Sequence, residues 1–173
     1  MKRSTERILT THVGSLPRPD DLIRTMFAKQ EGVPVDPVAL EVRTRAAVAE
    51  TVAKQVEAGV DVVSDGEMSK PSYVTYVIDR LDGFGGESHP VETYSDLDDF
   101  PVLHRKVFGD PGRSRRRLPA CDGPIAVRDP EAATVDVEHL KAALPEGQEA
   151  FLNAASPGVI ALFFRNDHYA TRE

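Results

Sequence analysis

The chain has 173 residues, with 28 Asp or Glu against 21 Lys or Arg, for a net charge of −7. This length allows one domain with a substantial core and excludes two large ones. The acidic balance argues against a nucleic-acid surface, no apolar run approaches the roughly 20 residues of a membrane span, and a single cysteine, Cys121, fits a reducing cytosol, so we expect a cytoplasmic protein.

The first predicted element is a strand over residues 8–13, which is rich in β-branched residues. Pro17 and Pro19 follow closely, and proline cannot continue a sheet ladder, so the strand ends near Val13. In the turn, Gly14 permits a positive φ, and Ser15 offers a hydroxyl and an amide. Such a turn can hold a carboxylate or phosphate on backbone donors, although an ordinary loop has the same composition.

Two helices follow. Asp20 caps a short one that carries Leu22 and Met26. The pair Asp36-Pro37 begins a long one, as an N-cap followed by proline. Small aliphatic residues recur along the long helix at three- and four-residue spacing, which is typical of a helix packed on a sheet. Gly59 is its expected C-terminal end.

The segment from Gly59 to Ser69 carries the main functional signal. A valine-rich run, typical of a buried parallel strand, ends in Asp65, Gly66 and Glu67. Carboxylates do not belong inside such a strand, so they must lie at its C-terminal edge, where parallel α/β folds place their ligand sites. The alternative is an ordinary strand-to-helix turn that Asp65 or Ser69 caps.

The rest of the chain continues the alternation of strands and helices. We expect a helix over residues 70–81, a long polar excursion over 87–117 that ends in a basic run, and a strand over 118–125. A helix capped by Asp136 and a strand over 150–155 complete the pattern. The basic run consists of Arg113, Arg115, Arg116 and Arg117.

This order predicts an α/β fold with a parallel sheet. Its strands would place Ser15, Glu67, Asp122 and Ser156 at one edge. A (β/α)₈ barrel needs roughly 250 residues, and this chain supplies about four of the eight strands.

Three motifs occur in order: THVGSLPRP from Thr11, GVDVVSDGEM from Gly59 and SPGVIALFF from Ser156. Together they resemble the cobalamin-independent methionine synthase family, in its catalytic C-terminal-type barrel and its stand-alone members. The resemblance implies a TIM barrel of which residues 1–173 form a single, incomplete N-terminal domain. That domain would hold about the first four βα units, with a long excursion after the second strand.

The resemblance also implies an activity. Family enzymes transfer a methyl group from 5-methyltetrahydrofolate, as its polyglutamate, to a zinc-bound homocysteine thiolate, and they use no cobalamin. The turn at Val13, Gly14 and Ser15 would hold the amino-acid part of homocysteine, and Glu67 would bind its ammonium. Asp65 stands where the synthases proper commonly carry histidine, which leaves the substrate open.

The family's zinc ligands come from the second half of its barrel, so the resemblance assigns no metal ligand and no catalytic residue here. Cys121 matches no zinc motif, and we expect it to be a small buried residue. We therefore expect a half-barrel that is inactive alone and binds no catalytic zinc. It would associate with a complementary half-barrel chain or with itself, because an open sheet has unpaired edges.

Other functions remain open at this point. One is a related zinc-dependent thiol alkyl transferase of the epoxide:coenzyme M type, which would act on another thiol or donor. A second is a catalytically silent fragment that keeps the amino-acid pocket, and a third is a non-enzymatic subunit that assembles with a partner half.

Overall fold

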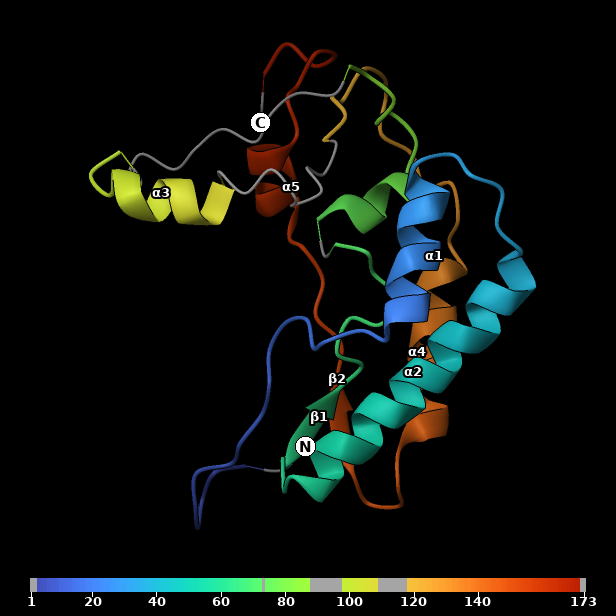
Figure 1. The fold of residues 1–173 in the computed structure, drawn as a ribbon, viewed down its shortest axis with the longest axis vertical. Coiled ribbons are helices and arrows are strands. Elements are labelled where there is room, and N and C mark those ends of the chain that lie inside the picture. Colours follow the sequence, from blue (N-terminus) through green and yellow to red (C-terminus); the bar gives the residue numbers. More distant parts are fainter. Residues whose placement is uncertain (1–2, 73, 88–97, 109–117, 172–173) are drawn as a thin grey trace. The chain divides into compact units, whose positions relative to one another are not determined.

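The structure is a computed structural model that describes residues 3–72, 74–87, 98–108 and 118–171. The chain divides into two compact units, one of residues 1–80 with 129–155 and the other of residues 81–128 with 156–173. Its elements, drawn in Figure 1, are mixed helices and strands. In chain order they are α1 (Asp20–Gln30), α2 (Pro37–Glu57), β1 (Val62–Ser64), the 3₁₀ helix η1 (Thr75–Asp79), α3 (Pro101–Phe108), α4 (Ala132–Ala143), β2 (Glu149–Phe151) and α5 (Pro157–Phe163). The expectation of a single incomplete domain stays a prediction.

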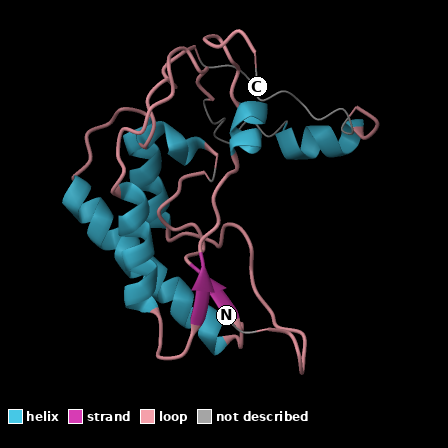
Figure 2. Cartoon of the chain, turned by 180° about the vertical axis from the view of Figure 1, so that it is seen from behind, coloured by secondary structure: helices cyan, strands magenta, loops and turns pink. Residues whose placement is uncertain are grey.

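The sheet of the first unit is parallel. Strands β1 and β2 lie side by side, with Val63 opposite Ala150 (Figure 2). Thr11 adds an isolated parallel bridge to Val62 on β1. Three segments far apart in the sequence therefore run in the same direction, which confirms the predicted parallel arrangement for this unit.

The predicted strand over residues 8–13 is reduced to that one bridge, and Asp61 explains why. Its carboxylate accepts hydrogen bonds from the amide (2.8 Å) and the hydroxyl (3.0 Å) of Thr10, and it also pairs with Arg7. The Arg7 guanidinium holds the pKa of Asp61 well below its usual range. A side chain thus fastens the N-terminal segment beside β1 where a longer ladder was expected.

Helix α1 begins at Asp20 itself, with Pro19 at the N-cap position and no side-chain cap, so the prediction that Asp20 caps it is wrong.

Helix α2 has the start and the end that the sequence predicts. The Asp36 carboxylate accepts from the amides of Val38 and Ala39, which caps the helix N-terminus. At the other end Gly59 has a φ of +79°, and the Val60 amide donates to the carbonyl of Gln55. This left-handed ending directs the chain straight into β1.

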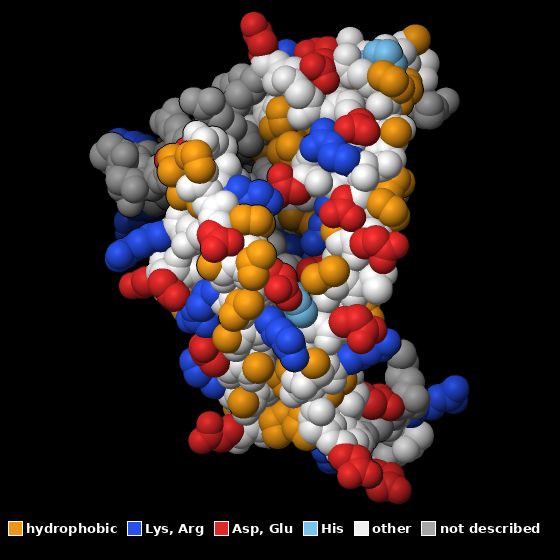
Figure 3. Space-filling view, turned by 90° about the vertical axis from the view of Figure 1, so that its right-hand side faces the viewer, with side chains coloured by type: hydrophobic (Ala, Val, Ile, Leu, Met, Phe, Trp, Pro, Cys, Tyr) orange, Lys and Arg blue, Asp and Glu red, His pale blue; other side chains and the backbone are white. Residues whose placement is uncertain are grey.

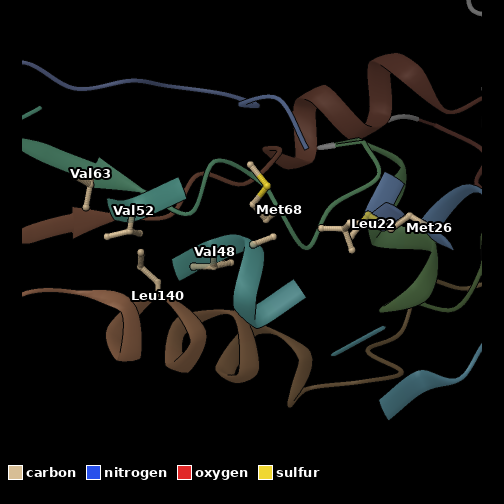
Figure 4. Close-up of a cluster of buried hydrophobic side chains, with 8 residues drawn as sticks. Leu22, Met26, Val48, Val52, Val63, Met68 and Leu140 are labelled. Atoms are coloured by element: carbon tan, nitrogen blue, oxygen red, sulfur yellow. The ribbon is translucent and has the colours of Figure 1, made fainter. Parts of the chain in front are cut away.

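The core of the first unit lies between the sheet and its helices (Figure 4). Val48 and Val52 of α2 meet Val63 of β1 and Leu140 of α4, and Leu22 of α1 continues the cluster. None of these side chains is more than 5% exposed. Each such burial contributes about 1.5–3 kcal/mol, so this cluster fixes α2 and α4 on the sheet whose edge carries the site.

Helix α4 begins at Ala132, so the prediction that Asp136 caps it is wrong. The Asp129 carboxylate instead accepts from the amides of Glu131 and Ala132, which fastens the first turn. Asp136 lies inside the helix, is 8% exposed and pairs with Arg80 at 2.7 Å. The Arg80 partner lets a carboxylate lie where the sequence pattern suggested a boundary.

The predicted helix over residues 70–81 is also wrong, because among the described residues of this range (70–72 and 74–81) only Thr75–Asp79 is helical, as a 3₁₀ helix. Lys70 is held by contacts to other segments: its carbonyl accepts from Arg18, and its ammonium donates to the carbonyl of Asn153 at 2.8 Å. The residues after Glu67 are therefore fixed as turns, and a regular helix does not start there.

In the second unit, Cys121 forms a parallel bridge with Asn166, and Leu81 forms an antiparallel one with Val127. Within the predicted strand over 118–125, Cys121 therefore forms an isolated bridge and no regular strand is present among these residues. The predicted excursion over 87–117 contains helix α3, so it is not wholly irregular. Cys121 is buried, as expected. The basic run Arg113, Arg115, Arg116 and Arg117 lies outside the described residues.

The surface has mixed charge. On the face shown in Figure 3, acidic and basic side chains are interspersed, and they do not form a basic stripe. On α2 and α1, for example, Arg43 pairs with both Asp21 and Glu50. Within the described residues, no helix is long and apolar enough to cross a membrane.

Gln55 offers a test of this fold. The buried amide of Gln55 donates to the carbonyl of Ser64 at 2.8 Å, and its oxygen accepts from the Ser64 amide at 3.0 Å. We expect Gln55→Leu to leave both Ser64 groups without these partners, at about 1–3 kcal/mol each. The Ser64 amide should then exchange with deuterium at least about fivefold faster. Exposed Lys54→Ala is the control, and unchanged Ser64 exchange in Gln55→Leu would contradict the account.

Candidate functional site

Polar side chains gather just past the C-terminal ends of the three parallel segments in the first unit. Ser15 follows the bridge at Thr11, Glu67 follows β1, and Asn153 follows β2. The carboxyl ends of parallel strands meet at one edge of a sheet. The fold therefore brings these three side chains together.

Glu67 is the centre of the site. This residue is only 2% exposed although its side chain is a carboxylate. The Ser15 hydroxyl donates to Oε2, and the Asn153 amide Nδ2 donates to Oε1. Since an ionised carboxylate can accept about four hydrogen bonds, both oxygens keep capacity for a further donor.

The sequence predicted that Ser15 and Glu67 lie at the same edge of the sheet, and their hydrogen bond confirms this, whereas Asn153 was missed. The sequence did contain a signal for it. Asn153 is a polar residue in the run that was assigned to a strand over 150–155, directly after the apolar residues of β2. Ending that strand at Phe151, where the structure ends it, would have placed Asn153 at the same edge as Glu67.

An uncommon backbone turn exposes the Glu67 side chain to these donors. Gly66 has a φ of +60° and Glu67 a φ of +58°, a region that non-glycine residues rarely adopt. A Cβ on Gly66 would lie 2.8 Å from Thr51 Cγ2 and 3.1 Å from Leu16 Cβ, so this position admits glycine alone. The Asp65 carboxylate accepts from the Glu67 amide at 3.0 Å, so Asp65 does cap this turn, although no regular helix follows directly.

Arg18 ties the two turns together. Its guanidinium donates to the main-chain carbonyls of Glu67, at 2.9 and 3.2 Å, and of Lys70. The Leu16 amide adds a bond to the Gly66 carbonyl at 3.0 Å. The turn after the first parallel segment thereby fixes the turn after β1, which keeps Ser15 and Glu67 in register.

Lys70 is the buried cation of the site. It is 3% exposed, and its ammonium lies 3.8 Å from Asp65 Oδ2 and 5.4 Å from the centre of the Tyr76 ring. Burial raises the pKa of Asp65, and the Lys70 charge and the Glu67 amide oppose that rise. Burial likewise raises the pKa of Tyr76. The site therefore places the buried ammonium of Lys70 beside the acidic groups of Asp65 and Tyr76.

The other predicted site residues have different surroundings. Val13 is 67% exposed, and Gly14 has the positive φ that was expected of it, at +99°. Asp122 and Ser156 belong to the second unit. There Asp122 accepts from the Gly85 amide at 2.9 Å, and Ser156 caps α5 by accepting from the Val159 amide at 3.3 Å.

Among the described residues, no three His, Cys, Asp or Glu side chains come together as metal ligands. Cys121 belongs to the second unit, where its Sγ lies 3.5 Å from the carbonyl of Gly123. The described residues therefore do not fit the zinc site that the family resemblance implies.

A comparison with known protein families shows to which family this chain belongs. Residues 8–100 match the model of the catalytic domain of the cobalamin-independent synthases. The chain belongs to this family. The matched range contains both turns that meet at Glu67, and the resemblance that the motifs predicted is confirmed.

Individual relatives agree with this assignment. Over 163 residues the chain is 29% identical to a methionine synthase of Sulfolobus acidocaldarius, covering 94% of this chain and 42% of that protein. Over 80 residues it is 35% identical to a 5-methyltetrahydropteroyltriglutamate–homocysteine methyltransferase of Streptomyces avermitilis, covering 46% and 10% of the two chains. Among solved structures, it resembles a B12-independent methionine synthase from Shewanella sp. W3-18-1 in complex with selenomethionine, with a TM-score of 0.64 and 22% identity.

That structural similarity covers 94% of this chain and 42% of the Shewanella protein, and it concerns the fold alone. The chain is mixed α/β and resembles part of a protein whose fold is a TIM barrel. It spans about two fifths of the length of the Sulfolobus and Shewanella relatives.

The buried pair of Asp65 and Lys70 gives a test by titration. We expect the ¹³Cγ signal of Asp65 to titrate with a pKa above the ordinary 3.8, because burial disfavours its charged form. Lys70→Met should raise this pKa further, since the ammonium is the strongest influence that opposes burial. By linkage, the Asp65 contribution to folding is full below the unfolded pKa of 3.8 and is lost as pH rises through the raised folded value.

Asp98, which is exposed, serves as the internal reference in the same spectra. An Asp65 midpoint at or below 3.8, or a midpoint that Lys70→Met lowers, would contradict the described burial.

Proposed function

We propose that this chain binds the amino-acid end of a homocysteine-like thiol, as the substrate-binding part of a methyltransferase of the cobalamin-independent methionine synthase type. The observation that carries the proposal is the buried Glu67 carboxylate, held between Ser15 and Asn153 at the strand edge. A carboxylate withdrawn from water, with free acceptor capacity, suits a substrate ammonium, because the charge attraction is screened less there than at the surface.

The other end of the amino acid would lie at the turn of Val13, Gly14 and Ser15. The positive φ of Gly14 turns the chain just before Ser15, which is exposed. Backbone amides in such turns hold carboxylates. Glu67 would then bind the ammonium of the amino acid, and this turn would bind its carboxylate. The Ser15 hydroxyl links the two.

The overall reaction would convert homocysteine to methionine. The thiol sulfur forms a bond to the methyl carbon, the bond from that carbon to the folate nitrogen breaks, and that nitrogen gains a proton, so that overall the thiol proton replaces the methyl group on the folate. The proposed donor is 5-methyltetrahydrofolate in its polyglutamate form, and the family membership supports it. The Shewanella relative is in complex with selenomethionine, which is an amino acid with the ammonium and carboxylate groups that this proposal requires.

The chemistry of the sulfur requires groups beyond those described. Since the described residues do not bring metal ligands together, we assign this chain only the binding and orientation of the amino acid. A complementary half-barrel chain would supply the remainder, including the zinc ligands, while a second copy could only cover the open edges of the sheet. That the chain forms part of a TIM barrel belongs to the same proposal. A cytoplasmic location remains an expectation from the single cysteine.

A thiol alkyl transferase acting on another thiol, such as coenzyme M, is the alternative within the same chemistry. Coenzyme M has no ammonium, so it would offer the buried Glu67 carboxylate no cationic partner beside Ser15 and Asn153. The Glu67 geometry therefore favours an amino-acid thiol. A catalytically silent binding fragment would keep the same pocket and differ only in lacking turnover.

Glu67→Gln tests the proposal. We expect the variant to bind L-methionine more weakly by about 1.5–3 kcal/mol, because it loses a charge-assisted hydrogen bond to the ammonium. Calorimetric titration of the purified chain measures this. Glu57→Gln is the matched control, since it makes the same change at an exposed position on α2. Equal methionine affinity in wild type and Glu67→Gln would exclude Glu67 as the ammonium partner.

A further inference from the structure

Asn153 carries a polar atom that the site leaves without a partner. Its side-chain carbonyl Oδ1 is buried, and no donor within the described residues reaches it. An unpaired buried acceptor costs about as much as a lost hydrogen bond, and native proteins rarely tolerate one without a reason. This atom lies on the same amide whose Nδ2 contacts Glu67 Oε1.

The orientation of this amide is determined by its surroundings. Nδ2 must face Glu67, because the flipped amide would place Oδ1 against a carboxylate oxygen and leave two acceptors in contact. The main chain of Asn153 is fixed as well, since the buried Lys70 ammonium donates to its carbonyl at 2.8 Å. The Lys70 ammonium itself pairs with the Asp65 carboxylate and makes a cation–π contact with the Tyr76 ring. Asn153 is therefore held at its side chain and at its main chain, while the buried Oδ1 has no partner within the described residues.

We propose that Asn153 is a second ligand for the substrate ammonium, with Oδ1 accepting one N–H while the Glu67 carboxylate accepts another. This inference rests on the proposed function and specifies its substrate class as a primary α-amino acid. An ammonium group has three N–H donors in a tripod, and two acceptors held on adjacent side chains match two of them. A ligand that lacks those donors would leave Oδ1 unpaired, so the site would discriminate against it.

The contact with the Asn153 carbonyl also gives Lys70 a role in the proposed site. It is a positioning residue, which acts on the substrate only through the main chain of Asn153. The Lys70 ammonium lies 3.8 Å from Asp65 Oδ2, so the buried cation has an acidic side chain beside it.

The test compares two ligands on several variants of the full chain by calorimetric titration. L-Methionine has three ammonium N–H donors, and N,N-dimethyl-L-methionine has one. We expect Asn153→Leu, which keeps the side-chain size and removes Oδ1, to bind methionine about tenfold or more weakly. In wild type, dimethylation should reduce affinity, and in Asn153→Leu that reduction should be smaller by a similar factor, because one of the two acceptors is already gone.

Asn153→Asp is the second variant, since it keeps an acceptor oxygen at the Oδ1 position. It should retain the discrimination against the dimethylated ligand, whatever its absolute affinity. Because the steric cost of the methyl groups is taken as common to all variants, the difference of differences in Asn153→Leu reports the loss of the side-chain amide, and Asn153→Asp assigns that loss to the acceptor oxygen.

The outcomes separate the two levels of the proposal. No methionine binding by wild type, or equal binding by Glu67→Gln, would overturn the proposed function itself. Loss of binding in Glu67→Gln, with unchanged affinity and unchanged dimethyl discrimination in Asn153→Leu, would leave the pocket in place and overturn the role of Asn153. A uniformly weaker Asn153→Leu that keeps the full dimethyl discrimination would reduce Asn153 to a structural residue and also overturn the inference.

Discussion

The turn after β1 is the constraint on which the site depends. Gly66 and Glu67 both take positive φ values, and this sharp turn brings the Glu67 side chain to the edge of the sheet. Left-handed backbone at a residue with a side chain costs free energy, so the surrounding contacts must stabilise it. Arg18 binds the Glu67 carbonyl, Asp65 accepts from the Glu67 amide, and Leu16 binds the Gly66 carbonyl.

Those contacts connect the substrate-facing residues to the core. Behind the turn, Thr51 of α2 leaves no room for a Cβ on Gly66, and α2 is fixed to the sheet by Val48, Val52 and Leu140. Gln55 binds both main-chain groups of Ser64, directly before the turn. The packing of one helix therefore determines where the Glu67 carboxylate lies, which explains how a small apolar core can support a buried acid.

The sequence predicted those parts of the fold that local chemistry determines. Asp36 and Gly59 fix the ends of α2 through side-chain and backbone capping, which act within a few residues. That Ser15 and Glu67 lie at the same edge was predicted because both follow strand-like runs at glycine turns. Asp136 was assigned wrongly, since its partner Arg80 lies far away along the chain and no local pattern reveals it. Lys70 was missed for the same reason, because its ammonium contacts the Asn153 carbonyl across 83 positions. Asn153 was missed because the predicted strand continued past Phe151.

A crystal structure of the chain with L-selenomethionine would test most directly where the amino acid binds. The anomalous signal of selenium would locate the ligand without reference to any relative. We expect one ligand at the strand edge, with its ammonium within hydrogen-bonding distance of Glu67 and Asn153 Oδ1 and its carboxylate at the turn of Gly14 and Ser15. A ligand bound elsewhere, or one whose ammonium contacts neither Glu67 nor Asn153, would contradict the assignment of this site.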